Sequence, residues 1–349
     1  MEYRTLGNTG TVVSTLCLGT MTFGAESDEK VAHEQLDRFL EQGGNFVDTA
    51  DVYADGESET IIGRWLGSRA GARDRVVIAT KGRFPRGEGP NEVGLSRVGL
   101  TRALEASLAR LGVEVIDLYQ AHAWDPLTPI EETLRFLDDA VRAGKIQYVG
   151  VSNFIGWQLQ KTALLARHLG LAPIVTLQPQ YNLLQRAVEF ELVQVCLNEG
   201  IGMLPWSPLG GGWLTGKYRR DLPPASTTRL GEDPDRGMEA YGRRNPEERT
   251  WRVIEAVRSV AEARGVSMAQ VALAWLVDRP AVTSVILGAR TLEQLDDNLG
   301  AAGLHLSASE TARLDETSTP IVDDYPYGEP GVSQRDRGLP APWSSTPTP

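Results

Sequence analysis

The chain has 349 residues, a formal net charge of −11 and only two cysteines. This acidic balance, with no long basic run, argues against a nucleic-acid surface. The longest apolar stretches are strand-sized and the first residues lack a signal-peptide pattern, so we expect no membrane segment and a cytoplasmic location. Cys17 and Cys196 match no metal or redox spacing and are predicted to be two separate buried thiols. The four histidines are few and scattered, so no metal site is expected.

The beginning of the chain predicts a β-hairpin. Tyr3–Leu6 and Val12–Ser14 are short β-prone runs on either side of a turn rich in Gly and Asn. From Thr15 onward, short apolar runs alternate with helix-length periodic segments. Eight of these runs are predicted strands: Leu16–Gly19, Asn45–Asp48, Val76–Lys81, Ile116–His122, Tyr148–Ser152, Ile174–Gln178, Ile201–Ser207 and Val282–Leu287.

Helix signals lie between these strands. Ser96 is a candidate N-cap before leucines that recur every three or four residues from Leu100 to Leu111. Two later segments open with Ser267–Gln270 and Thr291–Gln294, which match the capping-box pattern. Eight alternations of strand and helix predict a closed (β/α)8 TIM barrel, because the glycine-rich first turn of an open doubly wound sheet is missing.

Two segments depart from the alternation. Residues 208–250 follow the seventh strand, are rich in Gly, Pro and Arg, and are interpreted as a long loop that acts as a lid. Seven of the twenty prolines lie between Pro320 and Pro349. We therefore predict one barrel domain over residues 1–330 and a Pro-rich, partly disordered tail over residues 331–349.

Polar residues follow the apolar runs at the carboxyl ends of several strands, where barrel active sites are built. These strand-end residues are Asp48, Lys81, His122, Ser152, Asn153, Gln178, Trp206 and Ser207. One such residue would be an ordinary loop or cap residue. Their convergence on one face predicts a functional site.

Four residues near this face suggest proton-transfer chemistry. A phenol such as Tyr53 has an ordinary pKa near 10 and needs help to act as an acid at neutral pH. A neighbouring Lys81, held in place by Asp48, is predicted to lower that pKa by about three units, or roughly 4 kcal/mol. A neutral His122 would orient a carbonyl group. Asp51 is predicted to lie on the loop surface.

These residues belong to motifs that resemble the aldo-keto reductases, over about residues 3–330. The motifs are Gly19-Thr20-Met21-Thr22-Phe23-Gly24, Asp48-Thr49-Ala50 with Tyr53, Thr80-Lys81, Ile116-Asp117-Leu118-Tyr119 with His122, Gly150-Val151-Ser152-Asn153-Phe154, Gln178 with Tyr181-Asn182, Ser207-Pro208-Leu209-Gly210, and Gly288-Ala289-Arg290 with Gln294 and Asn298. The resemblance implies a barrel with an N-terminal hairpin that binds NADPH without a Rossmann domain and reduces aldehydes or ketones. It also implies that Tyr53 is the general acid, Lys81 tunes it, Asp48 pairs with Lys81, and His122 orients the substrate.

The same resemblance implies where NADPH binds, with NADH as the less favoured cofactor. The implied cofactor residues are Gly19, Thr20, Met21, Ser152, Asn153, Gln178, Trp206, Ser207, Pro208, Leu209, Gly210, Gly212, Lys217, Leu287, Gly288, Arg290, Gln294 and Asn298. Arg290 immediately precedes a predicted helix, where a guanidinium and free amides suit a 2′-phosphate. Many relatives have a Lys-Ser pair before this helix and an Arg within it, whereas this chain has Gly288, Ala289 and Gln294. The small carbonyl substrate is expected to contact Phe23, Tyr53, His122 and Trp124.

Other classes of protein fit the sequence less well. Some relatives of the family serve as β-subunits of potassium channels, so a cofactor-binding sensor with slow turnover is the main alternative. A class I aldolase would use Lys81 as a Schiff-base amine. The segment from Gly211 to Lys217 nearly spells a phosphate-binding P-loop, but Tyr218 replaces the Ser or Thr that binds magnesium. The physiological substrate and the oligomeric state stay open.

Overall fold

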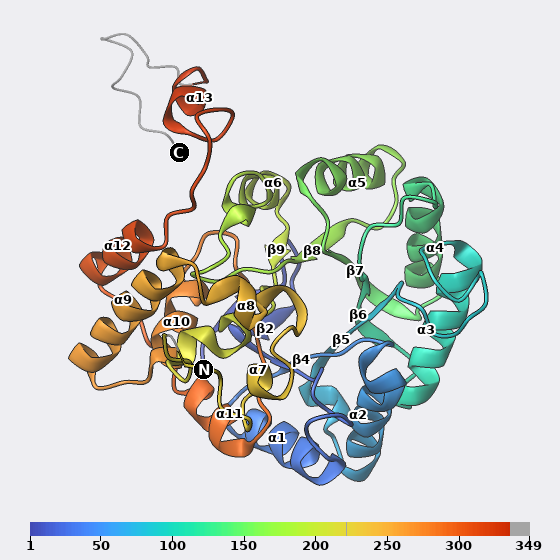
Figure 1. Cartoon of the computed structure of the whole chain (residues 1–349). Helices are drawn as coiled ribbons and strands as arrows, with labels where there is room; N and C mark the ends of the chain where they lie inside the picture. The colour runs from blue at the N-terminus through green and yellow to red at the C-terminus, as the bar shows by residue number, and fades with distance from the viewer. Residues whose placement is uncertain (221, 336–349) are drawn as a thin grey trace. The chain divides into compact units, whose positions relative to one another are not determined.

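The computed structural model describes residues 1–220 and 222–335. It divides into two compact units, Met1–Ser318 and the segment from Thr319 onward. In the described part of the first unit, eight parallel strands form one curled sheet in the order β10-β3-β4-β5-β6-β7-β8-β9 (Figure 1). Their bounds are β3 Leu16–Gly19, β4 Phe46–Asp48, β5 Val77–Gly82, β6 Ile116–Ala121, β7 Ile146–Ser152, β8 Ile174–Gln178, β9 Gly202–Met203 and β10 Val285–Leu287.

The sheet closes into a barrel between its two edge strands. A parallel bridge pairs Met203 in β9 with Val282, just before β10. The Met203 amide donates to the carbonyl of Ala281 at 2.7 Å, and the Thr283 amide donates to the carbonyl of Met203 at 2.9 Å. The predicted (β/α)8 barrel is therefore confirmed.

The last two strands are shorter than the sequence predicts. β9 has two residues and β10 has three, whereas each apolar run is at least six residues long. Pro205 and Pro208 lie in or next to the first of these runs. Because proline has no amide hydrogen to donate to a ladder, the strand stops before them.

Helices surround the strands, as Figure 1 shows for α1 to α6. The helices flanking the barrel are α1 Glu29–Glu41, α2 Glu57–Ser68, α3 Arg97–Leu111, α4 Ile130–Arg142, α5 Gly156–His168, α6 Leu192–Glu199, α9 Glu248–Arg264, α10 Met268–Val277, α11 Leu292–Leu299 and α12 Ala308–Thr317. Ser96 caps α3 and the Ser267–Gln270 capping box is confirmed. The second box is only half formed. Thr291 caps α11, but the side chain of Gln294 accepts from the amide of Arg290 instead of that of Thr291.

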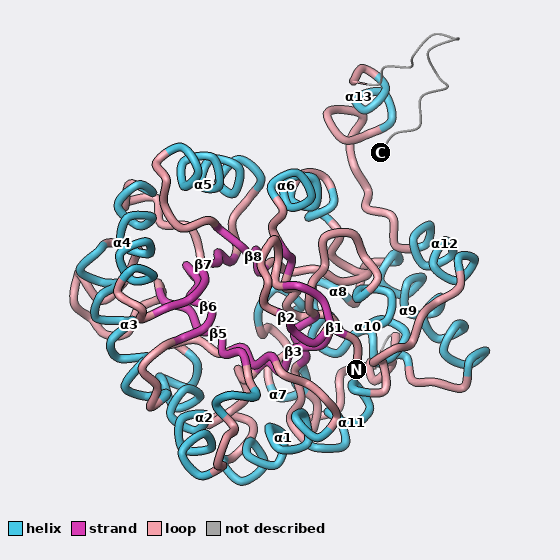
Figure 2. The backbone as a smooth tube through the Cα atoms, turned by 180° about the vertical axis from the view of Figure 1, so that it is seen from behind, coloured by secondary structure: helices cyan, strands magenta, loops and turns pink. Residues whose placement is uncertain are grey.

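The barrel interior holds its own apolar cluster. Cys17, Phe46, Ala79, Leu118, Val175, Leu204 and Ile286 form it together with Leu6 and Val13. The last two come from the N-terminal hairpin, in which β1 Tyr3–Thr5 pairs antiparallel with β2 Val12–Ser14 (Figure 2). Asn8 in the hairpin turn donates its amide to the carbonyl of Gly200, just before β9. The predicted hairpin thus closes the amino end of the barrel and leaves the carboxyl ends of the strands for the site.

The segment 208–250 is folded where the sequence predicted a loop. It contains the short helical elements η4 Gly210–Thr215, α7 Arg229–Glu232, η5 Gly237–Glu239 and α8 Tyr241–Arg244. Trp213 is fully buried and packs against the rings of Tyr218, Tyr241 and Trp251. This aromatic cluster gives the segment an apolar centre of its own.

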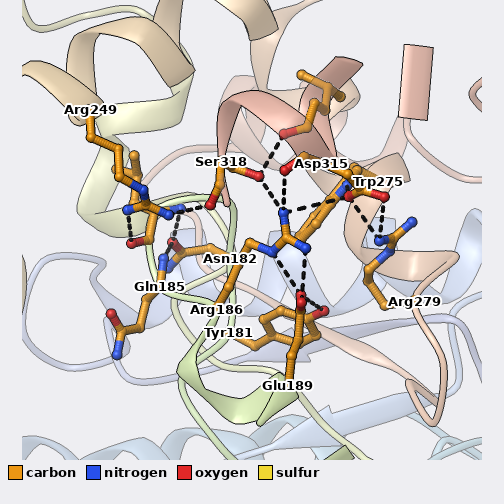
Figure 3. Close-up of polar contacts among 12 residues, drawn as sticks. Tyr181, Asn182, Gln185, Arg186, Glu189, Arg249, Trp275, Arg279, Asp315 and Ser318 are labelled. Atoms are coloured by element: carbon orange, nitrogen blue, oxygen red, sulfur yellow. Dashed lines mark hydrogen bonds and ion pairs between the residues drawn. The ribbon is translucent and has the colours of Figure 1, made fainter. Parts of the chain in front are cut away.

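The buried Arg186, in the segment after β8, forms hydrogen bonds with residues at the end of α12 (Figure 3). Arg186 donates to both carboxylate oxygens of Glu189 at 2.8 Å, to the carbonyl of Asp315 at 2.8 Å and to the hydroxyl of Ser318 at 2.7 Å. Trp275 also donates to the Asp315 carboxylate, at 2.8 Å. The first unit ends at this network.

The second unit contains α13 Glu329–Ser333. Residues 336–349 lie outside the described residues, and most of the predicted tail 331–349 falls among them. Cys17 and Cys196 are free and buried, as predicted. Within residues 1–220 and 222–335 no single helix is long and apolar enough to cross a membrane. By length and composition only, α9 and α10 pass that test as a pair, across a bend of 101°.

Candidate active site

The centre of the site is a buried ion pair between two strand ends. Asp48 is the last residue of β4 and Lys81 lies near the end of β5. The Lys81 ammonium donates to Asp48 Oδ2 at 2.7 Å and to the carbonyl of Thr49 at 2.6 Å. Lys81 is 0% exposed and Asp48 is 2% exposed, so the predicted pair is confirmed and is shielded from water.

Two glutamines hold the other carboxylate oxygen of Asp48. Gln178, the last residue of β8, donates to Asp48 Oδ1 at 2.8 Å, and Gln120 in β6 donates to the same atom at 3.2 Å. Gln178 also donates to Gln120 at 3.3 Å. The carboxylate therefore has donors from three strands, which fixes its orientation toward Lys81.

Tyr53 follows β4 at the start of η1 Tyr53–Gly56. The Lys81 ammonium donates to its hydroxyl at 3.2 Å and lies 4.8 Å from the centre of its ring. Contrary to the sequence prediction, the pKa of Tyr53 is raised, because burial outweighs the opposing effect of Lys81. Burial would lower the pKa of Lys81, but Asp48 and Tyr53 more than compensate and raise it. The resting site thus holds a protonated phenol beside a charged ammonium.

His122 completes this group just past the end of β6. Its ring meets the ring of Tyr53 edge-on at 5.9 Å. Burial, with smaller contributions from Lys81 and Arg83, lowers the pKa of His122 to about 2, so its imidazole is neutral. His122 Nδ1 is buried and has no hydrogen-bond partner among the described residues. A neutral imidazole can form a hydrogen bond with a polar group of a ligand without bringing a charge into the site.

Aromatic side chains stand around His122. Phe84 packs edge-on against its ring at 4.6 Å. Trp124 is half-buried and contacts Phe154 at 5.2 Å and the exposed Trp157 at 5.3 Å. Trp124 lies two residues after His122, and its role in a substrate wall stays a prediction. Phe84 and Trp157 were not singled out from the sequence.

Asp51 was predicted to lie on the loop surface, and this prediction is wrong. The residue is 1% exposed. The chain turns sharply after it, with φ of 46° at Ala54, 56° at Asp55 and 88° at Gly56. Three consecutive residues thus have left-handed backbone angles, a conformation that is uncommon for residues other than glycine. A Cβ at Gly56 would lie 2.9 Å from the side chain of Arg110, so this turn needs glycine.

The strand ends predicted to hold a carboxamide are close together. Asn153 has a φ of 56°, donates to the carbonyl of His122 at 3.0 Å and accepts from Trp206 Nε1 at 3.1 Å. Ser152 is buried and donates to the carbonyl of Gln178 at 2.8 Å. Trp206 is partly exposed, so a face of its indole is free to stack. Gln178, by contrast, uses its amide hydrogens on Asp48 and Gln120.

The turn after β9 is shaped by glycines. Ser207 and Gly210 to Gly212 have positive φ angles between 53° and 97°. A Cβ at Gly212 would lie 2.3 Å from the Lys217 side chain, so glycine is what lets this lysine fold back over the turn. The Asn182 side chain donates to the carbonyl of Ser207 at 2.8 Å. Pro208 is buried and Leu209 is partly buried in the same turn.

Four cations lie close to one another near the end of β10: Lys217, Arg229, Arg236 and Arg290. Burial, followed by the charges of Arg290 and Arg229, lowers the pKa of Lys217. Arg290 donates to Glu232 of α7 at 2.5 Å, and Arg236 pairs with Glu26 at 2.6 Å. These two ion pairs join the segment 208–250 to the loops after β10 and β3. Glu232 and Glu26 were not found from the sequence because they lie in segments without periodicity.

The remaining predicted cofactor residues shape the loop between β10 and α11. Leu287 is buried at the end of β10 and Gly288 after it is exposed. Asn298 in α11 donates to the carbonyl of Gly288 at 3.3 Å, and Gln294 accepts from the amide of Arg290 at 2.9 Å. Both side chains therefore hold the turn that presents Arg290.

The residues predicted at the end of the first barrel strand differ in their exposure to solvent. Gly19 ends β3, and a Cβ there would lie 2.8 Å from the carbonyl oxygen of Leu287. The Thr20 hydroxyl is within 3.0 Å of the Asp48 carbonyl, and Met21 is exposed. Phe23 is 0% exposed and packs in the hydrophobic core, so its expected role in a substrate wall does not fit this placement.

A barrel whose strand ends hold a phenol, an ammonium, a carboxylate and a neutral imidazole is equipped to move a proton at a carbonyl group. Comparison with known proteins defines the class. The model of the aldo/keto reductase family matches residues 15–319. The chain belongs to this family, and it is therefore classed as an oxidoreductase of a family that generally uses nicotinamide cofactors.

Three relatives illustrate the range of the family. The uncharacterized oxidoreductase YrpG of Bacillus subtilis is 38% identical over 314 residues, which cover 88% of this chain and 92% of that protein. Versiconal hemiacetal acetate reductase of Aspergillus parasiticus is 34% identical over 343 residues, 92% of this chain and 98% of that protein. A probable voltage-gated potassium channel subunit beta of Arabidopsis thaliana is 37% identical over 306 residues, 86% of this chain and 91% of that protein.

Proposed function

We propose that the chain reduces an aldehyde or ketone to an alcohol with NADPH as the hydride donor and Tyr53 as the proton donor. The observation that carries this proposal is the chain of contacts from Asp48 to Lys81 at 2.7 Å and from Lys81 to the Tyr53 hydroxyl at 3.2 Å. The cofactor, when bound, supplies the hydride to the carbonyl carbon and is itself oxidised to NADP⁺.

The protein residues act on the carbonyl oxygen. As the C–H bond forms, the π electrons of the carbonyl move to oxygen, which takes the proton of the Tyr53 hydroxyl. The phenolate left behind is stabilised by Lys81, whose charge Asp48 maintains. Because its pKa is raised above the ordinary value near 10, Tyr53 is protonated at neutral pH and the proton is present before the reaction begins. The neutral imidazole of His122 orients the carbonyl without competing as an acid.

The features around the mouth fit NADPH. The cations Lys217, Arg229 and Arg290 affect one another's charge and suit phosphate groups. Gly212 leaves the space in which Lys217 lies over the turn. The indole of Trp206 offers a flat face for a nicotinamide ring. The guanidinium of Arg290, which pairs with Glu232, is the group that we propose binds the 2′-phosphate and distinguishes NADPH from NADH.

The test is consumption of NADPH with a generic aldehyde, followed by absorbance. Tyr53→Phe is expected to lower kcat by roughly a hundredfold or more, because the proton donor is lost. Tyr119→Phe is the matched control, since the buried Tyr119 hydroxyl has no hydrogen-bond partner among the described residues. An unchanged rate in Tyr53→Phe would exclude the mechanism. Borohydride trapping of a carbonyl compound on Lys81 would instead indicate a Schiff-base enzyme.

A regulatory role is the second candidate, and it is favoured by the 37% identity to a protein named as a potassium channel β-subunit. In that case NADPH would bind tightly while turnover stayed slow with every carbonyl compound. Single-turnover and steady-state rates on the same preparation separate the two functions, because a reductase turns over many times and a sensor does not.

A further inference from the structure

A cavity lies next to Asp51 and Phe84, close to the candidate active site, and has no part in the proposed reduction. It has a volume of about 200 Å³ and is enclosed by Asp51, by the loop between β5 and α3, and by α3 itself. Tyr53, Lys81 and His122 do not line it. Phe84 does, and because its ring also packs on His122 at 4.6 Å, it separates the cavity from the catalytic residues.

Asp51 is an unpaired buried carboxyl group in this cavity. It is 1% exposed, and neither carboxylate oxygen has a hydrogen-bond partner among the described residues. A buried carboxylate normally carries hydrogen bonds or an ion pair, because desolvation without them is costly. Burial, together with the nearby charge of Glu59, raises the pKa of Asp51 to about 7. The carboxyl group is therefore partly protonated at neutral pH and ready to act as a hydrogen-bond donor.

Four arginines line the same cavity: Arg83, Arg86, Arg102 and Arg110. Two of them are occupied, since Arg86 pairs with Asp55 at 3.0 Å and Arg110 pairs with Glu59 at 2.7 Å. The other two have unused donors. Arg102 makes no hydrogen bond or ion pair with the described residues, and the buried Arg83 Nε has no partner among them. This local excess of guanidinium groups contrasts with the chain's net charge of −11.

From this arrangement we infer that the cavity is a binding site for a small oxyanion, held by Arg83, Arg102 and the carboxyl group of Asp51. The oxyanion is a phosphate-type group or a carboxylate, both of which guanidinium groups bind with charge-assisted hydrogen bonds. With about 200 Å³, the cavity has room for such a group and for a few waters, but it is too small for a whole dinucleotide. Glu92 also lines the cavity, but one of its carboxylate oxygens accepts from the amide of Gly89 at 2.7 Å.

The site links anion binding to proton uptake. The charged groups that act on Asp51 come from every element around it: Glu59 in α2 favours the proton, while Arg86, Arg110 in α3 and Lys81 in β5 oppose it. An incoming anion is repelled by ionised Asp51 and accepts a hydrogen bond from the protonated form, so binding should take up about half a proton at pH 7 and close to one proton at about pH 8. Above this pH, affinity should fall roughly tenfold per unit.

The experiment is a calorimetric titration of the full chain with inorganic sulfate, which stays fully ionised from weakly acidic to alkaline pH. Chloride holds the ionic strength constant, and two buffers of different ionisation enthalpy count the protons. We expect saturable binding with about half a proton taken up at pH 7, close to one proton taken up at about pH 8, and binding weakened roughly tenfold or more between pH 7 and about pH 8.5. Competition by inorganic phosphate and by acetate then shows which oxyanion the site prefers. If neither phosphate nor acetate displaces sulfate, the cavity is not the oxyanion site that we infer.

Variants separate this site from the proposed cofactor site. Arg102→Ala should weaken sulfate binding by about tenfold or more. The control Arg97→Ala, which removes an arginine of the same helix that pairs with Asp139 outside the cavity, should leave it unchanged. Binding should also persist in Arg290→Ala, and Arg102→Ala should leave NADPH consumption unaffected.

Asp51→Asn tests the proton linkage directly, because the amide resembles the protonated carboxyl group but does not titrate. Sulfate should still bind, with no proton uptake and no weakening at alkaline pH. Unchanged proton uptake in this variant would refute the assignment to Asp51. Equal losses of sulfate affinity in Arg102→Ala and Arg97→Ala, or complete loss of sulfate binding in Arg290→Ala, would refute the site itself. These two outcomes can be observed even if the Asp51 variant does not fold.

Discussion

The ammonium of Lys81 lies 2.7 Å from the carboxylate of Asp48, at a place where neither side chain reaches solvent. Each charge is retained only because the other is present. Desolvation alone would favour a neutral lysine, and Asp48 is the strongest of the groups that oppose it. The stability of the folded barrel therefore depends on the same ion pair that supports the proposed chemistry.

This dependency predicts a characteristic double-mutant cycle. Asp48→Asn should destabilise the protein by roughly 3–5 kcal/mol, because Lys81 is left as an unpaired buried charge. Lys81→Met should cost a similar amount for the converse reason. The double variant should recover a large part of the loss, since both charges are gone. Urea unfolding measures all three free energies, and simple additivity of the two single changes would show that the pair is not coupled.

Replacement of Glu232 should change cofactor preference. Glu232 occupies Arg290 at 2.5 Å, so it competes with any phosphate for that guanidinium. Glu232→Gln should tighten NADPH binding relative to NADH by roughly threefold, the scale of a partly exposed ion pair. Fluorescence quenching gives both affinities. Glu248→Gln is the control, because Glu248 pairs with Arg220. If the ratio of NADPH affinity to NADH affinity equals that of the unmodified protein, Arg290 does not bind the 2′-phosphate.

His122 should make the protein less stable in acid. Its folded-state pKa is lowered to about 2 from an ordinary value of 6.5. Below about pH 6.5 the unfolded chain binds a proton at this residue that the native state does not, so stability falls as the pH falls. His122→Gln should reduce the loss of unfolding free energy between about pH 7.5 and pH 5 by about 2 kcal/mol. Urea titrations at both pH values measure it, with the exposed His168→Gln as the control.

The sequence predicts the barrel and its four central residues because both rest on strong local patterns. Apolar runs with periodic segments between them define strands and helices, and polar residues at strand ends converge in a parallel barrel whatever the loops do. The positions of Lys81 and Asp48 at neighbouring strand ends were therefore sufficient to predict their contact. Gln120, which holds the same carboxylate, was missed because it lies inside an apolar strand, where nothing marks a glutamine as facing the site.

The errors come from loops, where side-chain direction depends on backbone angles that the sequence does not reveal. Asp51 was placed at the surface because it is charged and follows a strand, but it is 1% exposed, and the residues that line a cavity with it come from the loop after β5 and from α3, which are distant in sequence. Phe23 was expected at the mouth and lies in the core instead. The raised pKa of Tyr53 was missed for a different reason, since burial depends on the packing of the whole mouth and not on the neighbouring lysine alone.

The Arg186 network predicts that the end of α12 and the turn after β9 are mechanically linked. Arg186 donates to the carbonyl of Asp315 and to the hydroxyl of Ser318 (Figure 3). Asn182 donates to the carbonyl of Ser207. Arg186→Leu should cost roughly 3 kcal/mol, because partners such as Glu189 lose a buried cation. Amide hydrogen exchange should then accelerate in α12 and around Ser207. The control is Arg313→Ala on the exposed side of α12, expected to change stability by less than about 0.5 kcal/mol. Faster exchange in α12 without any change near Ser207 would show that the two regions are independent.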